Sequence, residues 1–507
     1  MKNGVRGSGL GAREQQCAWT GTKYLWLLLA FVVVHGVMGA CLPVSGDEAY
    51  YWDCSRHPDW ATYDQPPAMM LAPIPFRLVL GETALAARGP AILASFLIGV
   101  ILLPLVRRLG GGPREAAWAY LVLHATPLFL FGSFYASTDV GMMAGYLGAA
   151  WAAVAIAQGE RRAWWGFGVA VALGFLAKFP AVLALPMLVP LLLRREVRAQ
   201  LRTPAPYLAG ALSLALTAPV WIWGSRHEWV NLTFQLQQRH DRGALTLVHL
   251  GAFVLFSALL VSPPLLAAMA AEWWRGWRRR DPAWNVVLVG AAAPFAFFAF
   301  VSLREDVAPH WGAPGVVLGA AVLALSAPRP RRLIGWGIGF GAALSAVALG
   351  LVVFATTALD VSWPLVGRAR GAAADALAAA VANDEVVAEI SRRLAPGEMM
   401  ASESYTDVHL YAFLSRGRIP TRLAHVHGGV HGLASLYWYR PAELAGRDFL
   451  FVTERPGQAD ALRAVFASVT EEAPFEIRRD GRTIRRVLFL RCRNLLRPEG
   501  AFTRLKG

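Results

Sequence analysis

Two adjacent carboxylates, Asp47 and Glu48, follow the first long apolar run of the chain by only a few residues. A carboxylate pair beside a bilayer surface can supply a general base and a partner that binds a hydroxyl group. Solvated outer loops also carry such acids, so the two residues alone leave both interpretations open. The same loop holds aromatic side chains that offer faces on which a sugar stacks, or anchors at the membrane interface: Tyr50, Tyr51, Trp52, Trp60 and Tyr63.

A third carboxylate, Asp139, opens an apolar segment farther along the chain. An acid at the edge of a membrane segment is costly and tends to be functional. Its alternative role is to cap the N-terminus of the helix together with Ser137 and Thr138, which requires no active site. The sequence leaves both roles open.

Basic residues from separate loops complete the candidate set. Lys178 interrupts an apolar region, and Arg239, Arg242 and Arg304 come from other loops predicted on the same side. Cations at this level suit the phosphate of a lipid carrier, and the alternative is snorkelling toward lipid headgroups. No histidine pair has helical metal-binding spacing, so a divalent metal stays open but without support. The sequence contains no phosphate-binding glycine loop and no serine-nucleophile motif.

The elements that must position these residues are membrane helices. The chain has 507 residues, of which 56% are apolar and 16% are charged, and its apolar runs match the roughly 20 residues that cross a bilayer. Most arginines behind the net charge of +15 lie in short loops. This pattern is typical of a topology signal, not of a nucleic-acid-binding stripe. The first run is long for a cleaved signal peptide and predicts an uncleaved anchor.

The apolar runs predict about eleven membrane segments, over residues 24–42, 89–106, 115–133, 139–157, 163–177, 180–193, 205–223, 246–270, 283–302, 312–327 and 333–357. With a cytoplasmic N-terminus, the inner loops hold twenty Lys and Arg residues and the outer connections hold eight, as the positive-inside rule requires. The halves of 163–193 are interpreted as two short crossings or a re-entrant hairpin. The polar connections then share the outer face, which predicts one composite site.

The composition changes after about residue 358. Residues 1–358 are predicted to form the membrane domain, 359–384 a helical linker, and 385–507 a small α/β domain outside the membrane. The segments "DFLFVTE" and "RRVLFLRC" are typical of strands, whereas "DEVVAEISRRLA" and "QADALRAVFASV" are typical of amphipathic helices.

The first loop also resembles a known family. The segments "DEAYYW", "HPDWATYDQPP" and "LAARGPAIL" are similar to the first outer loop of the polyprenyl-phosphate-dependent glycosyltransferases of family 39. That family includes protein O-mannosyltransferases and the bacterial aminoarabinose and galacturonic acid transferases that modify lipid A. The Asp139 loop, "GFLAKFPAVL" and "HEWVNLTFQLQQR" match in order, and "ESYTDVHLYAFL" matches more weakly. The resemblance implies a polytopic α-helical protein of the GT-C type in the bacterial inner membrane, with its site facing the periplasm.

The resemblance also implies roles for individual residues. Asp47 matches the family's catalytic Asp, and the expected substrate-binding residues are Glu48, Tyr50, Asp64, Arg88 and Asp139. The expected contacts to the donor phosphate are Lys178, Arg239 and Arg304. In the aminoarabinose transferases the position of Asp64-Gln65 is usually Glu-Lys, the Glu being a proposed metal ligand. This chain departs there, so no metal ligand is predicted.

The residues and the resemblance together predict an enzyme that transfers a sugar from a polyprenyl-phosphate donor to an envelope acceptor: lipid A or its core, a glycan, or a protein hydroxyl. Asp47 is expected to act as general base, or to orient a phosphate acceptor, with inversion at the anomeric carbon. The expected partners are the donor, the lipid or glycan acceptor and membrane lipids, and no nucleic acid. A lipid or polysaccharide transporter is the alternative and would need polar residues through the bilayer; a scaffold is a third option.

Overall fold

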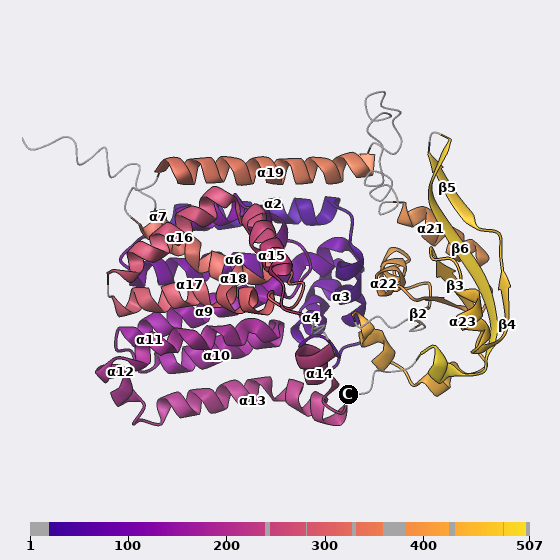
Figure 1. Cartoon of the computed structure of the whole chain (residues 1–507), viewed down its shortest axis with the longest axis horizontal. Coiled ribbons are helices and arrows are strands. Elements are labelled where there is room, and N and C mark those ends of the chain that lie inside the picture. The colour runs from indigo at the N-terminus through magenta and orange to yellow at the C-terminus, as the bar shows by residue number, and fades with distance from the viewer. Residues whose placement is uncertain are drawn as a thin grey trace, which may run out of the picture.

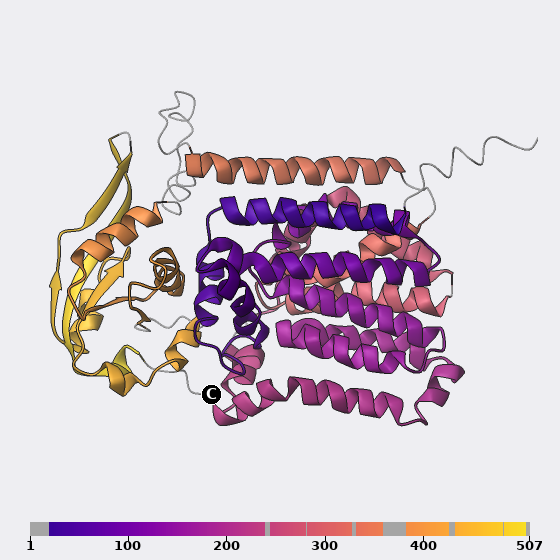
Figure 2. The same cartoon turned by 180° about the vertical axis from the view of Figure 1, so that it is seen from behind.

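The computed structural model describes residues 20–238, 244–279, 281–326, 331–357, 382–424, 431–479 and 481–502. Within these ranges the chain forms a bundle of aligned helices and, beside one end of the bundle, a sheet with short helices (Figures 1 and 2). We call this end of the bundle the sheet end and the opposite one the arginine end. Most of the predicted linker and the predicted phosphate contact Arg239 lie outside the described residues.

Apolar helices run back and forth between the two ends (Figure 1). In chain order they are α2 (Gly21–Cys41), α6 (Ala84–Arg108), α7 (Pro113–His124) with α8 (Pro127–Gly132), α9 (Asp139–Ala157), α10 (Ala163–Ala177), η1 (Phe179–Leu188) with α11 (Val189–Leu192), α13 (Ala205–Arg226), α15 (Leu247–Val261) with α16 (Pro263–Trp277), α17 (Pro282–Val301), α18 (Ala313–Leu325) and α19 (Arg331–Thr357). Six described helices are long and apolar enough to cross a membrane, or up to seven spans if the bent pair α15–α16 is one. The polytopic helical architecture is confirmed. The number eleven stays a prediction, because four apolar helices are only 10–17 residues long.

Two segments of the bundle are broken for local reasons. Between α15 and α16 the chain turns by 100°, because Ser262 has a φ of 84° and Pro263 follows it without an N–H group. The predicted pair within 163–193 breaks at Lys178, whose backbone is extended. Because α10 and η1 pack against each other, the chain folds back at this lysine and does not continue as one helix.

The two ends of the bundle differ in chemistry. The sheet end holds the short helices of the polar connections: α3 (Gly46–Cys54), α4 (Ala68–Leu71), α5 (Pro73–Leu80) and α14 (Val230–Thr233). The arginine end holds α12 (Arg195–Gln200) and a set of exposed indoles on the adjoining helix turns: Trp118, Trp165, Trp274, Trp277 and Trp336. Exposed indoles of this kind anchor a protein at a membrane–water interface.

Residues 383–502 form a six-stranded sheet with the order β2-β1-β3-β6-β4 and with β5 paired to β6. Its strands are β1 (Met399–Ser402), β2 (Thr421–Leu423), β3 (Phe449–Thr453), β4 (Phe466–Glu471), β5 (Phe475–Arg479) and β6 (Arg482–Leu495). β1 pairs in parallel with β2 and β3, and β6 is antiparallel to β3, β4 and β5. Three helices accompany them: α21 (Asn383–Arg393), α22 (Tyr405–Leu414) and α23 (Ala459–Arg463).

Alternate residues of β3 fill two separate apolar clusters, as the two-residue period of a strand requires. Phe449 and Phe451 join one cluster, and Leu450 and Val452 join the other. The predicted strands "DFLFVTE" and "RRVLFLRC" coincide with β3 and β6. The predicted helix over 458–469 is wrong in its second half, because the helix ends at Arg463 and the next residues pair with β6 as β4.

Candidate active site

The first candidate catalytic residue lies in the opening turn of α3, at the sheet end. The Ser45 hydroxyl accepts the N–H of Glu48 at 3.3 Å, and the Glu48 carboxylate accepts the N–H of Ser45 at 3.0 Å. This reciprocal cap fixes the turn. Between these two residues, the Asp47 side chain is exposed, and its Oδ1 accepts a hydrogen bond from the Tyr405 hydroxyl at 2.7 Å. Asp47 is therefore both accessible and oriented.

Glu48 has the opposite surroundings. It is 1% exposed, and its two carboxylate oxygens each accept an N–H of Arg88 at 2.7 Å. Oε1 also accepts the N–H of Ala136 at 3.0 Å. The other Arg88 donors reach carbonyl oxygens at the end of α2: Gly39, Leu42 and Pro43. The Glu48–Arg88 pair thus ties α2, α3 and α6 to the loop before α9, with both side chains enclosed and engaged.

Tyr50 and Asp64 form a second buried contact. The Tyr50 hydroxyl lies 2.8 and 2.9 Å from the two carboxylate oxygens of Asp64, and the Thr62 hydroxyl donates to Oδ1 at 3.0 Å. Burial raises the pKa of Tyr50, and the nearby charge of Asp64 raises it further. Tyr50 therefore stays a hydrogen-bond donor to Asp64 throughout the physiological pH range.

Asp139, the first residue of α9, pairs with Lys178 at the end of α10, with 2.7 Å between Oδ1 and Nζ. The Nε2 atom of His310 lies 3.9 Å from Oδ2. The two paired side chains are 15% and 9% exposed, so they are mostly but not wholly enclosed. The Ser137 hydroxyl accepts the N–H of Asp139 at 3.3 Å. The Asp139 carboxylate is thus directed to Lys178.

The environment of Tyr51 shows that the acids lie close to one another. Burial raises the pKa of the Tyr51 hydroxyl, and the carboxylates of Asp139, Asp64 and Asp47 raise it further. Carboxylates from the start of α3, the loop that follows it and the start of α9 are therefore all near enough to raise the pKa of one phenol. The structure brings three of the predicted site residues into one cluster.

An apolar groove adjoins this cluster. Its volume is about 400 Å³, and it runs between α5, α6, α9 and α10, with Tyr51 and Thr138 among its lining residues. Leu93 and Leu97 also line it and are 47% and 40% exposed on the surface of the bundle. The groove therefore leads from the acids to the side of the bundle that faces lipid, and we call it the lateral groove.

The C-terminal part of the chain contributes two side chains that our sequence analysis missed, Tyr405 and His409, both on α22. Tyr405 donates to Asp47, and the fully buried His409 places its Nδ1 2.8 Å from Oδ2 of Asp53. Burial acts to raise the pKa of Asp53, but the hydrogen bond and charge of His409 outweigh it, so that the pKa is lowered. The weak match "ESYTDVHLYAFL" contains both residues and was the available signal.

The helix α22 also approaches α3 closely. A Cβ atom added to Gly46 would lie 2.5 Å from the Cβ of Thr406, so a larger residue at this position would push the helices apart. The ring of Tyr405 lies edge-on to that of Tyr50, with 5.8 Å between the centroids. The sheet is therefore joined to the bundle at the candidate site itself.

The remaining predicted site residues are placed as follows. Arg304 is exposed in the connection after α17, and Arg239 lies outside the described residues. Across the described ranges, no three His, Cys, Asp or Glu side chains come together as a metal site. The described residues therefore give no donor set for the divalent metal that the sequence left open.

Comparison with known proteins now adds to this geometry. The family model of dolichyl-phosphate-mannose-protein mannosyltransferases matches residues 64–223. The crystal structure of ArnT from Cupriavidus metallidurans in the apo state is 18% identical, with a TM-score of 0.61 over 92% of this chain and 98% of that one. The form of ArnT bound to undecaprenyl phosphate gives a TM-score of 0.62 over 93% and 98%, also at 18% identity. No curated protein sequence matches significantly.

Residues 64–223 are therefore similar to this family of glycosyltransferases, and the chain shares the fold of ArnT. The family match and the shared fold indicate a membrane glycosyltransferase. The likeness to ArnT covers 92% of this chain, which is more than the bundle alone, so it extends into the C-terminal sheet. The family match begins at residue 64 and does not include Asp47.

Proposed function

We propose that this enzyme transfers a sugar from a polyprenyl phosphate to an envelope acceptor at the periplasmic face of the bacterial inner membrane. The acceptor is a hydroxyl or phosphate group of lipid A or its core, of a glycan, or of a protein. The observation that carries the proposal is the exposed Asp47 carboxylate, which Tyr405 holds and which acts, with Asp64 and Asp139, on Tyr51, a residue that lines the lateral groove.

The lateral groove accounts for the lipid part of the donor. Its lining is apolar and it leads to the lipid-facing side of the bundle, which suits a prenyl chain. The phosphate then lies at the end of the groove beside Thr138 and Ala177, and Lys178, which follows Ala177 and pairs with Asp139, contacts it. We propose the exposed Arg304 as a second contact to this phosphate, and Arg239 stays a prediction outside the described residues. A lysine at this position stabilises the charge of the departing phosphate.

The chemical step follows from these positions. Asp47 accepts the proton of the acceptor hydroxyl while the oxygen of that hydroxyl attacks the anomeric carbon of the sugar. The bond from that carbon to the phosphate oxygen breaks, and the electron pair leaves with the polyprenyl phosphate. Attack from the face opposite to the leaving group inverts the anomeric centre. A phosphate acceptor has no proton to lose, and Asp47 then orients it.

The buried contacts hold this arrangement in place. Glu48 and Arg88 act as positioning residues, because their hydrogen bonds are directed to each other and to the backbone. Tyr50 and Asp64 are buried and hydrogen-bonded to each other, so in this proposal they position the site rather than bind the sugar directly.

The orientation in the membrane rests on the charge of the loops. The arginine-rich loops favour the cytoplasm for the arginine end. The sheet, the acid cluster and the end of the groove beside Thr138 then face the periplasm.

Mass spectrometry of envelope lipids, glycans and proteins tests the proposed function. Cells without the gene should lack at least one sugar-modified species. The wild-type gene should restore this species, as should the variant Asp306→Asn, which changes an exposed acid after α17. The variant Asp47→Asn should fail to restore it. A deletion that leaves every glycosylated species unchanged and alters only the distribution of a lipid between leaflets would favour the transporter alternative.

A further inference from the structure

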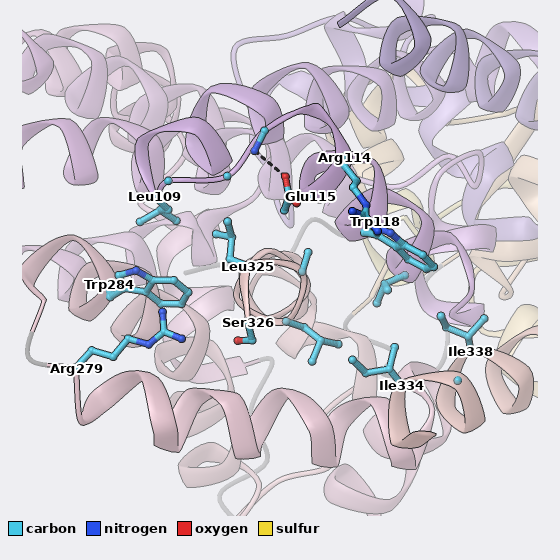
Figure 3. A pocket seen from close by; sticks show the side chains of 17 residues that line it. Leu109, Arg114, Glu115, Trp118, Arg279, Trp284, Leu325, Ser326, Ile334 and Ile338 are labelled. Atoms are coloured by element: carbon cyan, nitrogen blue, oxygen red, sulfur yellow. Dashed lines mark hydrogen bonds between the residues drawn. The ribbon is translucent and has the colours of Figure 1, made fainter. Parts of the chain in front are cut away.

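A second cavity, of about 890 Å³, lies at the arginine end, far from the acid cluster. It is lined by α7, α18 and α19 and by the residues that join α16 to α17. Figure 3 shows that the end of α18, with Leu325 and Ser326, lies between two groups of side chains, Arg114 with Trp118 and Arg279 with Trp284. Neither the glycosyl transfer nor the acid cluster uses this cavity.

The outer part of the cavity is basic and aromatic. Arg114 and Arg279 are exposed, and the Arg279 guanidinium lies 4.4 Å from the ring centre of Trp284. The acid in the lining, Glu115, accepts the N–H of Gly112 at 2.8 Å in the cap of α7, so one of its oxygens is engaged. The described side chains at the mouth leave an excess of positive charge.

The inner part of the cavity is apolar, and the change in polarity follows the helix axes. Arg114, Trp118 and Val122 line the cavity at intervals of four residues, on one face of α7. Ile334 and Ile338 repeat this spacing on α19. The lining therefore passes from guanidinium through indole to aliphatic groups along the direction in which the helices cross the membrane.

We infer that this cavity binds an anionic phospholipid of the leaflet at the arginine end, with its headgroup at the basic mouth that Arg114 and Arg279 border on either side of the end of α18, and its acyl chains along Val122 and Ile338. A soluble anion would contact the arginines but not the aliphatic side chains of the inner part of the cavity. A neutral lipid would contact the aliphatic side chains but would not pair with the arginines. The exposed indoles of neighbouring helices lie on the same turns, which puts the basic mouth at headgroup level. Basic pockets between membrane helices on the cytoplasmic side suit anionic headgroups.

Native mass spectrometry of the full-length protein, with phosphatidylglycerol or phosphatidylcholine as added probe, tests this inference. The wild type should retain phosphatidylglycerol in preference to phosphatidylcholine. The double variant Arg114→Gln with Arg279→Gln should retain at least about tenfold less phosphatidylglycerol than the wild type, because each basic group near a membrane surface adds to the attraction of anionic lipid. Gly335→Leu should also weaken retention, because nothing lies within 4 Å of a Cβ added there and the side chain can occupy the cavity.

The matched control is Arg161→Gln with Arg162→Gln, which removes the same charge from two exposed arginines outside the cavity. Its retention of phosphatidylglycerol should equal that of the wild type. Equal losses in the two double variants would show general surface attraction and overturn the inference. Displacement of the lipid by excess inorganic phosphate would also overturn it, because the acyl chains would then contribute nothing. Sugar transfer is not measured, so these results are independent of the proposed function.

Discussion

Two ion pairs at the sheet end of the bundle have equally short contacts but differ in how far they are enclosed and in how many hydrogen bonds join them. Glu48 and Arg88 are each 1% exposed, meet through two short hydrogen bonds and have further partners in the backbone. Asp139 and Lys178 meet through one hydrogen bond, remain partly exposed and adjoin the lateral groove. The first pair is closed to a ligand, and the second lies next to the groove that we propose for the donor.

The difference teaches that a carboxylate is a candidate for chemistry only when its hydrogen-bonding capacity is incompletely filled. Asp47 and Glu48 are consecutive residues of one helical turn, yet one is exposed with a single tyrosine partner and the other is enclosed. A buried pair of charges holds its neighbours in place, and removing one member leaves the other charge uncompensated. The following predictions test this contrast.

The largest expected effect is on folding. Glu48→Gln leaves the Arg88 guanidinium buried without its counter-charge, which should destabilise the protein by about 3–5 kcal/mol. Thermal unfolding of the purified protein measures the loss, with Asp47→Asn as the control in the same turn, which should unfold near the wild-type temperature. A Glu48→Gln protein with wild-type stability but no activity would place Glu48 in the substrate site instead.

The second prediction concerns the open pair. Lys178→Ala should raise the donor KM about 10- to 100-fold, because a hydrogen bond to a charged group contributes about 1.5–3 kcal/mol. Lys178→Arg should restore donor use poorly, because a planar guanidinium does not replace a compact ammonium group. Arg226→Ala, an exposed cation at the end of α13, is the control. An unchanged donor saturation curve for Lys178→Ala would remove Lys178 from the phosphate site.

The third prediction concerns the tyrosine that holds Asp47. Tyr405→Phe removes the hydroxyl and keeps the ring packed on Tyr50, so the rate of sugar transfer should fall about three- to tenfold while the donor KM stays unchanged. Tyr207→Phe, an exposed ring at the far end of α13, should have no effect. A raised donor KM with an unchanged rate would show that Tyr405 contacts the donor and does not position Asp47.

The smallest effect is on the pH dependence of stability. Burial raises the pKa of Asp407 on α22 to about 6, although Arg485 opposes the shift. The folded protein therefore keeps a proton on Asp407 that the unfolded chain releases near its ordinary pKa of 3.8. The stability that this proton gives is complete below about pH 4 and is lost as the pH rises through about 6.

Asp407→Asn avoids this loss. Its melting temperature should equal that of the wild type at pH 4 and exceed it by about 2–4 °C at pH 7.5. Thermal unfolding at the two pH values measures the difference. An equal gain at both values would mean that the asparagine adds a contact and that titration of Asp407 is not involved.

Much of this arrangement was predictable from the sequence because it is local. The apolar runs marked the bundle helices, the alternation in "DFLFVTE" marked β3, and the short polar connections marked the end that carries Asp47, Asp139 and Lys178. The contacts of Tyr405 and His409 were not predictable, since each joins residues more than 350 positions apart. The closure of the Glu48–Arg88 pair depends on carbonyl oxygens of α2, whose positions no side-chain pattern encodes.

The error at 458–469 has a related cause. The segment "QADALRAVFASV" has a helical pattern throughout, but Phe466 and Val469 occupy places beside β6 that only a strand can fill. Pairing along the sheet edge outweighed the local helical preference.

Single-turnover sugar transfer by purified Asp47→Asn protein tests the central claim most directly. The substitution keeps the shape of the side chain and removes its ability to accept a proton. With a hydroxyl acceptor, the rate should fall by about 10²–10⁴, while donor binding is retained because the phosphate contacts lie on other loops. Asp306→Asn is the control. Asp59, in the same loop as Asp47, is less suitable, because it accepts a hydrogen bond from Trp223 at 2.8 Å that the substitution would disturb. Transfer by Asp47→Asn within about threefold of the wild type would contradict the assignment of Asp47 as the general base.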